Sequence, residues 1–307
     1  MFPQIQGSTD QYLADLDRTQ QQINQAESEV SSGLSVEQPS DDPGAVPQIF
    51  QLQADIASNQ QIQTNLGNVT TEVDTADSVL QNAVSAVESA ISIAAQGATS
   101  TATADQRQNL AQQVAALQQT IVGISQTTVN GRYIFSGDQD QQPAYELDST
   151  QPDGVKQLIT APSTRMIVDG SGTSIAVAKT AQEIFDARNS DGSVASGNVF
   201  AALNDLKTAL LNNDQAGITQ ASDELNSADD YLNQQVTFYG VVEDQLTNAT
   251  TLAQKFQTEQ QTNLSQLRDA DVPTVALQLS QLQVQQEAAL SSEASIQQAR
   301  NLFDYIA

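Results

Sequence analysis

The chain has 307 residues, with 37 acidic and 11 basic side chains and a formal net charge of −26. Binding to nucleic acid or to an anionic membrane surface needs clustered Lys and Arg, so this charge argues against both partners. The sequence contains neither cysteine nor histidine, which excludes disulfides, thiol nucleophiles and imidazole bases. It shows no P-loop, dinucleotide fingerprint or G-x-S-x-G motif. We therefore expect a protein that is not an enzyme and needs no cofactor or metal.

Two membrane signals are also missing from the sequence. No stretch is long and apolar enough to span a bilayer, and the first residues lack the basic and apolar regions of a secretory signal peptide.

The first helical pattern covers residues 9–32 and is expected to end at Gly33, because glycine enters the left-handed region at little cost. Its predicted seam alternates steps of three and four: Leu13, Leu16, Gln20, Ile23, Glu27, Val30 and Leu34. Pro39 and Pro43 then forbid a continuous helix. Asp41 and Asp42 lie in this loop, where helix capping explains them better than a metal site, since calcium-loop spacing is missing.

The stretch from residue 45 to residue 95 predicts a much longer helix, about 75 Å at 1.5 Å per residue. Its seam positions are Ile49, Leu52, Ile56, Asn59, Gln63, Leu66, Thr70, Val73, Asp77, Leu80, Val84, Val87, Ile91 and Ala94. A heptad seam of this length faces a partner helix. A second very long pattern, residues 214–269, is the expected antiparallel partner, with seam positions at Leu225, Leu232, Val236, Tyr239, Leu246 and Leu252.

The segment between the two long helices begins with a helical pattern and then changes to turn signals and short alternating runs. A helix expected over residues 105–128 returns along the first rod, because the connection before it is short. Residues 131–180 then carry turn signals and short alternating runs that predict a β-rich insertion of four to six strands. Short helices are expected at residues 181–187 and 198–211.

A final helix is expected from Thr274 to about Asp304, after a break at Asp271-Val272-Pro273. The chain is thus nearly palindromic, with a terminal helix, a breaker and a long rod on each side of the insertion. The predicted fold class is mainly α with a small β insertion, an elongated antiparallel long-helix coiled-coil rod with paired terminal helices. The predicted domains are residues 1–38 plus 273–307, residues 39–130 plus 181–272, and residues 131–180.

Three runs carry a resemblance to a known family. They are Ser31-Ser32-Gly33-Leu34 with Pro39-Ser40-Asp41-Asp42-Pro43, Asn130-Gly131-Arg132-Tyr133-Ile134-Phe135-Ser136-Gly137, and Asp271-Val272-Pro273-Thr274-Val275-Ala276 with Leu302-Phe303-Asp304-Tyr305-Ile306. They resemble the bacterial flagellin superfamily and, within it, most closely the hook-associated protein 3 family of hook–filament junction proteins. The extreme N-terminus, Phe2-Pro3-Gln4, departs from the family's usual Arg-Ile/Val-Ser/Thr start.

The resemblance implies a structural adaptor of the bacterial flagellum that acts outside the cell. Such a protein leaves through the flagellar type III export channel and forms a ring of copies. Its partners are the other hook–filament junction protein, flagellin, and an export chaperone on the C-terminal helix. By the same analogy the terminal helices build an inner coiled-coil tube. We expect assembly contacts at Leu13, Leu16, Ile23, Val30, Val275, Leu279, Leu282, Ile296 and Phe303. The simpler alternative is that these residues pack within one monomer.

Two other functions stay open from the sequence. The chain could be the flagellin that polymerises into the filament, which differs from a junction protein in being present in thousands of copies. It could also be a binding module, such as an adhesin that displays residues 131–180. Catalysis by the paired acids Asp138 and Asp140, or Asp229 and Asp230, is a weaker reading, because solvated turns and helix faces explain both pairs.

Overall fold

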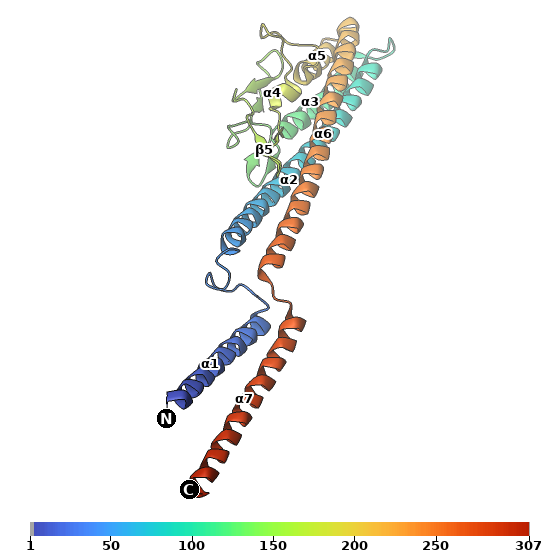
Figure 1. Ribbon diagram of the computed structural model, residues 1–307. Coiled ribbons are helices and arrows are strands. Elements are labelled where there is room, and N and C mark those ends of the chain that lie inside the picture. The colour runs from blue at the N-terminus through green and yellow to red at the C-terminus, as the bar shows by residue number, and fades with distance from the viewer. Residues whose placement is uncertain (1–2, 307) are drawn as a thin grey trace. The chain divides into compact units, whose positions relative to one another are not determined.

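The computed structural model describes residues 3–306, with side chains described from Asp10 to Ser295. The helices are α1 (Pro3–Ser32), α2 (Val46–Gly97), α3 (Ala104–Ser125), α4 (Ala181–Phe185), α5 (Val199–Leu211), α6 (Gln215–Arg268) and α7 (Val272–Ile306). The strands are β1 (Thr128–Val129), β2 (Arg132–Tyr133), β3 (Tyr145–Leu147), β4 (Val155–Gln157), β5 (Met166–Val168) and β6 (Ser174–Ala176). The chain is mainly α with a small β insertion, as the sequence predicts (Figure 1).

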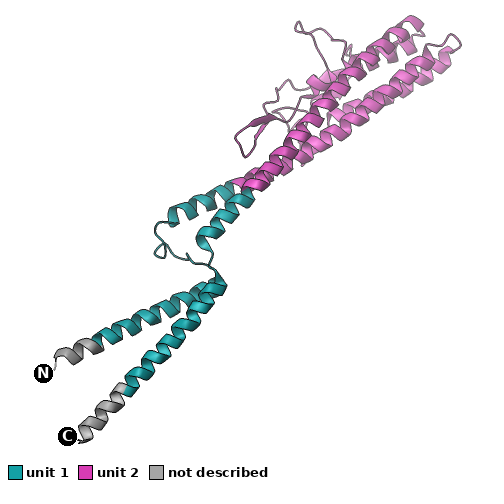
Figure 2. Cartoon of the chain, turned by 45° about the vertical axis from the view of Figure 1, so that its right-hand side comes forward, with its two compact units in different colours: residues 1–58, 257–307 teal, residues 59–256 magenta. Residues whose placement is uncertain are grey.

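The chain divides into two compact units, residues 1–58 with 257–307 and residues 59–256 (Figure 2). The boundary falls inside α2 and α6, so the continuous long helices contribute to both units. The three-part division expected from the sequence stays a prediction.

In the unit of residues 59–256, α2 and α6 run antiparallel side by side (Figure 1). The direction follows from two contacts: Asn59 near the start of this part of α2 meets Ala253 late in α6, and Gly97 lies close to Ile218 at the start of α6. The buried positions of α6 keep a regular step of three and four, and bulky side chains alternate with alanine from Ile218 to Leu232. They are Ile218, Ala221, Leu225, Ala228, Leu232, Gln235, Tyr239, Val242, Leu246, Ala249 and Ala253.

The seam predicted for α2 agrees with its buried positions in one row of residues and differs in the neighbouring row. Leu66, Val73, Leu80 and Val87 are buried as predicted, but the neighbouring row consists of Ala76, Ala83 and Ala90 in place of Asp77, Val84 and Ile91. Val84 and Ile91 are only partly buried against the same core. The cause is that α2 has more than one partner: α3 contributes Val114 and Ile121 to this core, which widens the apolar stripe beyond a two-helix seam.

The loop at the end of α2 is held by Arg107 of α3, a buried cation that the sequence analysis did not single out. Its Nε donates to the carbonyl of Gly97 at 2.8 Å, and its Nη2 donates to the carbonyl of Thr99 at 3.1 Å. The last carbonyls of a helix have no partners within the helix and carry partial negative charge. Arg107 satisfies both needs, which explains a charge at this buried place.

The β insertion consists of three antiparallel hairpins, β1–β2, β3–β4 and β5–β6. The first turns at Asn130 and Gly131, whose φ values of 53° and 77° are those of a type I′ turn, as the Asn-Gly signal predicts. The chain then enters the core at Phe135, which is fully buried and packs edge-on against Phe185 and Tyr239. This aromatic cluster joins the insertion to α4 and α6.

Candidate assembly surface

In the unit of residues 1–58 and 257–307, α1 and α7 lie side by side (Figure 1). α1 ends at Gly33, whose φ of +73° and N–H bond to the carbonyl of Glu29 form the predicted left-handed cap. α7 begins at Val272, two residues earlier than predicted, because Pro273 is tolerated in a first helical turn, where its missing N–H has no helical partner. The interhelical break therefore lies at residues 269–271.

Most of the described candidate assembly residues lie along the contact between these two helices. Ile23, Val275 and Leu282 are buried, and Leu16, Val30 and Leu279 are half-buried. These six residues pack within one chain, and their role between copies stays a prediction. The side chains of Ile296 and Phe303 lie outside the described residues.

Leu13 is the exception, because its side chain is 52% exposed. The α1 seam runs through Tyr12, Thr19 and Ala26, one residue before the predicted Leu13, Gln20 and Glu27. Gln20 instead flanks the seam, where its Oε1 accepts a 2.6 Å hydrogen bond from Nε2 of Gln286. Ala26 is buried where Glu27 would have placed a carboxylate, so burial selects the register with the smaller loss of hydration.

The opposite face of α7 carries exposed apolar side chains that sequence analysis missed. Leu277 is 63% exposed and Val284 is 62% exposed, and they lie one heptad apart. A spacing of seven places them on one face, away from the seam of Val275, Leu279 and Leu282. A search for apolar residues seven positions apart, outside the main seam, could have identified them. Leu13 of α1 and Leu290 of α7 are also at least half exposed, but only Leu277 and Val284 among these four described residues are separated by one heptad.

Four of the acids considered above as metal-binding or catalytic candidates lie in loops, where hydrogen bonds or an ion pair engage them, and Asp229 and Asp230 lie in α6. Oδ2 of Asp41 accepts hydrogen bonds from the N–H groups of Glu37 and Gln38, which lower the pKa of this carboxyl. Oδ1 of Asp42 accepts from Gly44 and Ala45, so it organises the turn before α2 rather than the first turn of the helix itself. Asp140 bonds to Arg132, and Asp138 accepts from the N–H of Thr164.

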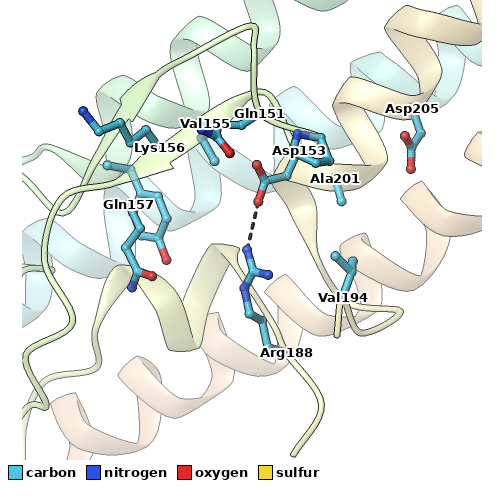
Figure 3. A pocket seen from close by; sticks show the side chains of 11 residues that line it. Gln151, Asp153, Val155, Lys156, Gln157, Arg188, Val194, Ala201 and Asp205 are labelled. Atoms are coloured by element: carbon cyan, nitrogen blue, oxygen red, sulfur yellow. Dashed lines mark hydrogen bonds and ion pairs between the residues drawn. The ribbon is translucent and has the colours of Figure 1, made fainter. Parts of the chain in front are cut away.

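The insertion holds a cavity of about 530 Å³, lined mainly by β4, the 151–153 turn, Arg188 and α5 (Figure 3). Two residues that line it, Tyr145 and Arg188, contact the fully buried carboxylate of Asp186. This carboxylate accepts hydrogen bonds from Tyr145 Oη at 2.8 Å and Asn198 Nδ2 at 2.6 Å. Arg188 bridges Asp186 at 3.0 Å and Asp153 at 2.9 Å. Burial and the neighbouring Asp186 raise the pKa of Tyr145 above its usual range. The polar groups are thus satisfied by one another, the arrangement of a structural network rather than of a reactive site.

Within residues 3–306, no helix combines the length and apolar character that crossing a bilayer requires. Among the side chains described, from Asp10 to Ser295, no three or more acidic groups gather closely enough to hold a metal ion.

Known proteins resemble this chain in two ways. A family model for the bacterial flagellin N-terminal helical region matches residues 6–140. No curated protein sequence matches the chain. Among solved structures, one described as a flagellar hook-associated protein from Vibrio parahaemolyticus is 18% identical, covers 75% of this chain and 100% of its own, and has a TM-score of 0.65.

Two structures from Legionella pneumophila are also similar. Flagellar hook-associated protein 3 is 14% identical and covers 71% of this chain and 98% of its own, with a TM-score of 0.62. The flagellar junction protein FlgL is 14% identical and covers 66% of this chain and 100% of its own, with a TM-score of 0.55. These findings agree with the resemblance predicted from the sequence: residues 6–140 match the model of the flagellin N-terminal helical region, and the chain has the fold of the flagellar hook-associated protein structures.

Proposed function

We propose that this protein is a structural, non-enzymatic adaptor of the bacterial flagellum that joins the hook side to the flagellin filament. The observation that supports it most is the combination of a flagellin N-terminal helical region with the fold of flagellar junction proteins. Its partners would be the other hook–filament junction protein on one side and flagellin on the other. The protein would act outside the cell, after export through the flagellar type III channel with a chaperone on α7.

Assembly would proceed through the terminal helices, with copies forming a ring. The exposed side chains of Leu13, Leu277 and Val284 support this proposal. If a neighbouring copy covered them, the removal of their apolar surface from water would stabilise the assembly. The net charge of −26 gives neighbouring copies a mutual repulsion, so association would need such specific contacts.

A filament subunit is the second candidate, and the match to the flagellin region favours it. Electron microscopy of cells that lack this protein, with flagellin assayed in the medium, separates the two. Hooks without filaments together with shed, unpolymerised flagellin are the result expected of a junction protein. Loss of filaments with no flagellin shed would identify this chain as the filament subunit, and normal flagella would overturn both proposals.

A further inference from the structure

The loop after α1 crosses the end of α6 through a short set of backbone hydrogen bonds. The carbonyl oxygen of Arg268, the last residue of α6, accepts from the N–H of Ser35 at 2.7 Å and of Val36 at 3.2 Å. The Ser35 hydroxyl donates to the same oxygen at 3.1 Å. The Ala270 N–H donates in return to the carbonyl of Gly33 at 2.9 Å. Leu34 and Asp269 face each other across this contact as an antiparallel bridge, and we call residues 33–36 with 268–270 the crossing.

The crossing does for α6 what a C-terminal cap usually does within one helix. The last carbonyls of a helix have no intrahelical donor, so they need partners from elsewhere. Here the donors come from a segment far away in sequence, the residues directly after α1. The left-handed φ of Gly33 turns the chain out of α1 so that Ser35 meets Arg268. One contact therefore ends α6 and anchors the end of α1 at the same place.

Among the side chains described, from Asp10 to Ser295, the α1–α7 pair that leaves the crossing buries few apolar groups. Its buried apolar side chains are Ile23, Ala26, Val275 and Leu282, and Gln20 and Gln286 meet beside them. Two helices with so many polar positions are marginal as an isolated pair in water. The crossing holds the end of α1 next to the start of α7, which raises the effective concentration of one helix near the other.

We infer that Ser35 and the Arg268 carbonyl form the positioning contact for the terminal helices, so that α1 and α7 pair in the free chain only while the crossing is closed. Pairing then starts at Gly33 and Val272 and proceeds toward the chain ends. In its last step this inference rests on the proposed function: the pair held by the crossing is what a neighbouring copy would meet.

Hydrogen exchange of the full-length chain, followed by mass spectrometry, tests the contact. Ser35→Pro removes both the N–H and the hydroxyl donor, and Ser35→Ala removes the hydroxyl alone. Ser40→Pro is the matched control, because the Ser40 N–H donates no hydrogen bond in the described chain. We expect exchange in residues 10–32 and 272–290 to rise about tenfold in Ser35→Pro and less in Ser35→Ala. Exchange in α3 and α5 should stay unchanged in all variants. Unchanged exchange in α1 and α7, or an equal rise throughout the chain, overturns the inference.

A disulfide across the bridge supplies a second, independent test. Directly opposed residues of an antiparallel pair lie about 4.5–5.5 Å apart at Cα, within the range that a disulfide spans. The sequence has no cysteine, so Leu34→Cys with Asp269→Cys can form only this disulfide within one chain. Added to Ser35→Pro, the oxidised pair should restore slow exchange in α1 and α7, and reduction should remove it again. Failure of the oxidised form to restore protection contradicts a positioning role. Neither readout depends on flagellar assembly, so the inference can stand or fall separately from the proposed function.

Discussion

The side-chain amide of Asn59 donates a 2.7 Å hydrogen bond to the backbone carbonyl of Ala253, from inside the contact between α2 and α6. Asn59 is only 4% exposed, and its Oδ1 has no hydrogen-bond partner. The same carbonyl also receives Nε2 of Gln63 at 3.3 Å. A buried amide with one end unpaired is a cost to stability, and one known use of such a group is to fix the register of paired helices.

Replacing Asn59 with Leu should therefore raise the free energy of unfolding by about 1 kcal/mol, because it removes an unpaired acceptor and adds apolar burial. Urea unfolding followed by circular dichroism measures this. Asn65→Leu, at an exposed position of the same helix, is the control and should change stability by less than about 0.5 kcal/mol. A loss of more than about 1 kcal/mol in Asn59→Leu would mean that the Ala253 bond outweighs the unpaired oxygen.

The buried carboxylate of Asp186 yields a prediction of opposite sign. It binds Tyr145, Asn198 and Arg188, so Asp186→Ala leaves the buried Tyr145 hydroxyl without its acceptor and removes one of the two carboxylates that pair with Arg188. We expect a loss of about 3 kcal/mol or more in urea unfolding, since breaking a buried charge pair from one side is strongly destabilising. Asp191→Ala removes a carboxylate from an exposed turn and should cost about 1 kcal/mol or less. An equal loss of stability in the two variants would contradict the prediction that the buried contacts of Asp186 stabilise the fold.

Periodicity located the helices well because their seams are long. The Gly33 cap and the Asn130-Gly131 turn were predictable because both need a positive φ, which few residues adopt. The side of each seam was less predictable. Reading bulky residues first favours Leu13, whereas the folded pair buries Ala26 and exposes Leu13. Alanine carries little hydrophobic signal in a sequence, yet its small size lets two helices approach closely.

Contacts between distant segments could not be predicted from the sequence, for a different reason. Nothing local to Asp186 or Arg107 distinguishes a buried carboxylate or guanidinium from a solvated one, because their partners come from other elements. The crossing is similar, since its donors and acceptors are main-chain groups that every residue carries. Likewise the exposure of Leu277 and Val284 follows only once α1 is known to cover the other side of α7.

The position of Asp229 on α6 predicts that the stability of the protein depends on pH. Burial, and then the nearby carboxylates of Glu88 and Asp230, raise the pKa of Asp229 above the ordinary value of an aspartate. A raised carboxyl pKa means that the folded state holds its proton more tightly than the unfolded chain. Its contribution to stability is therefore fully present below about pH 3.8 and is lost as pH rises through the raised value.

At neutral pH Asp229→Asn should thus stabilise the protein, by about 1 kcal/mol or less because the side chain is partly solvated. The advantage should shrink as pH falls toward 4, and urea unfolding at pH 7 and pH 4 measures the difference. Asp223→Asn, at an exposed position of the same helix, is the control. An advantage that is independent of pH would show that the raised pKa of Asp229 is not its source.

Leu277 and Val284 carry the last prediction, which separates assembly from folding. Both side chains are more than half exposed, so Leu277→Gln with Val284→Gln should change the free energy of unfolding of the monomer by less than about 0.5 kcal/mol. Gln also keeps a helix propensity close to that of Leu. If a neighbouring copy covers this face, the double variant should fail to restore filaments to cells that lack the protein, although it is exported in normal amounts. Val241→Gln, which changes an exposed apolar residue of α6, is the matched control and should restore them. Full restoration by the double variant would place the contacts between copies elsewhere on the terminal helices.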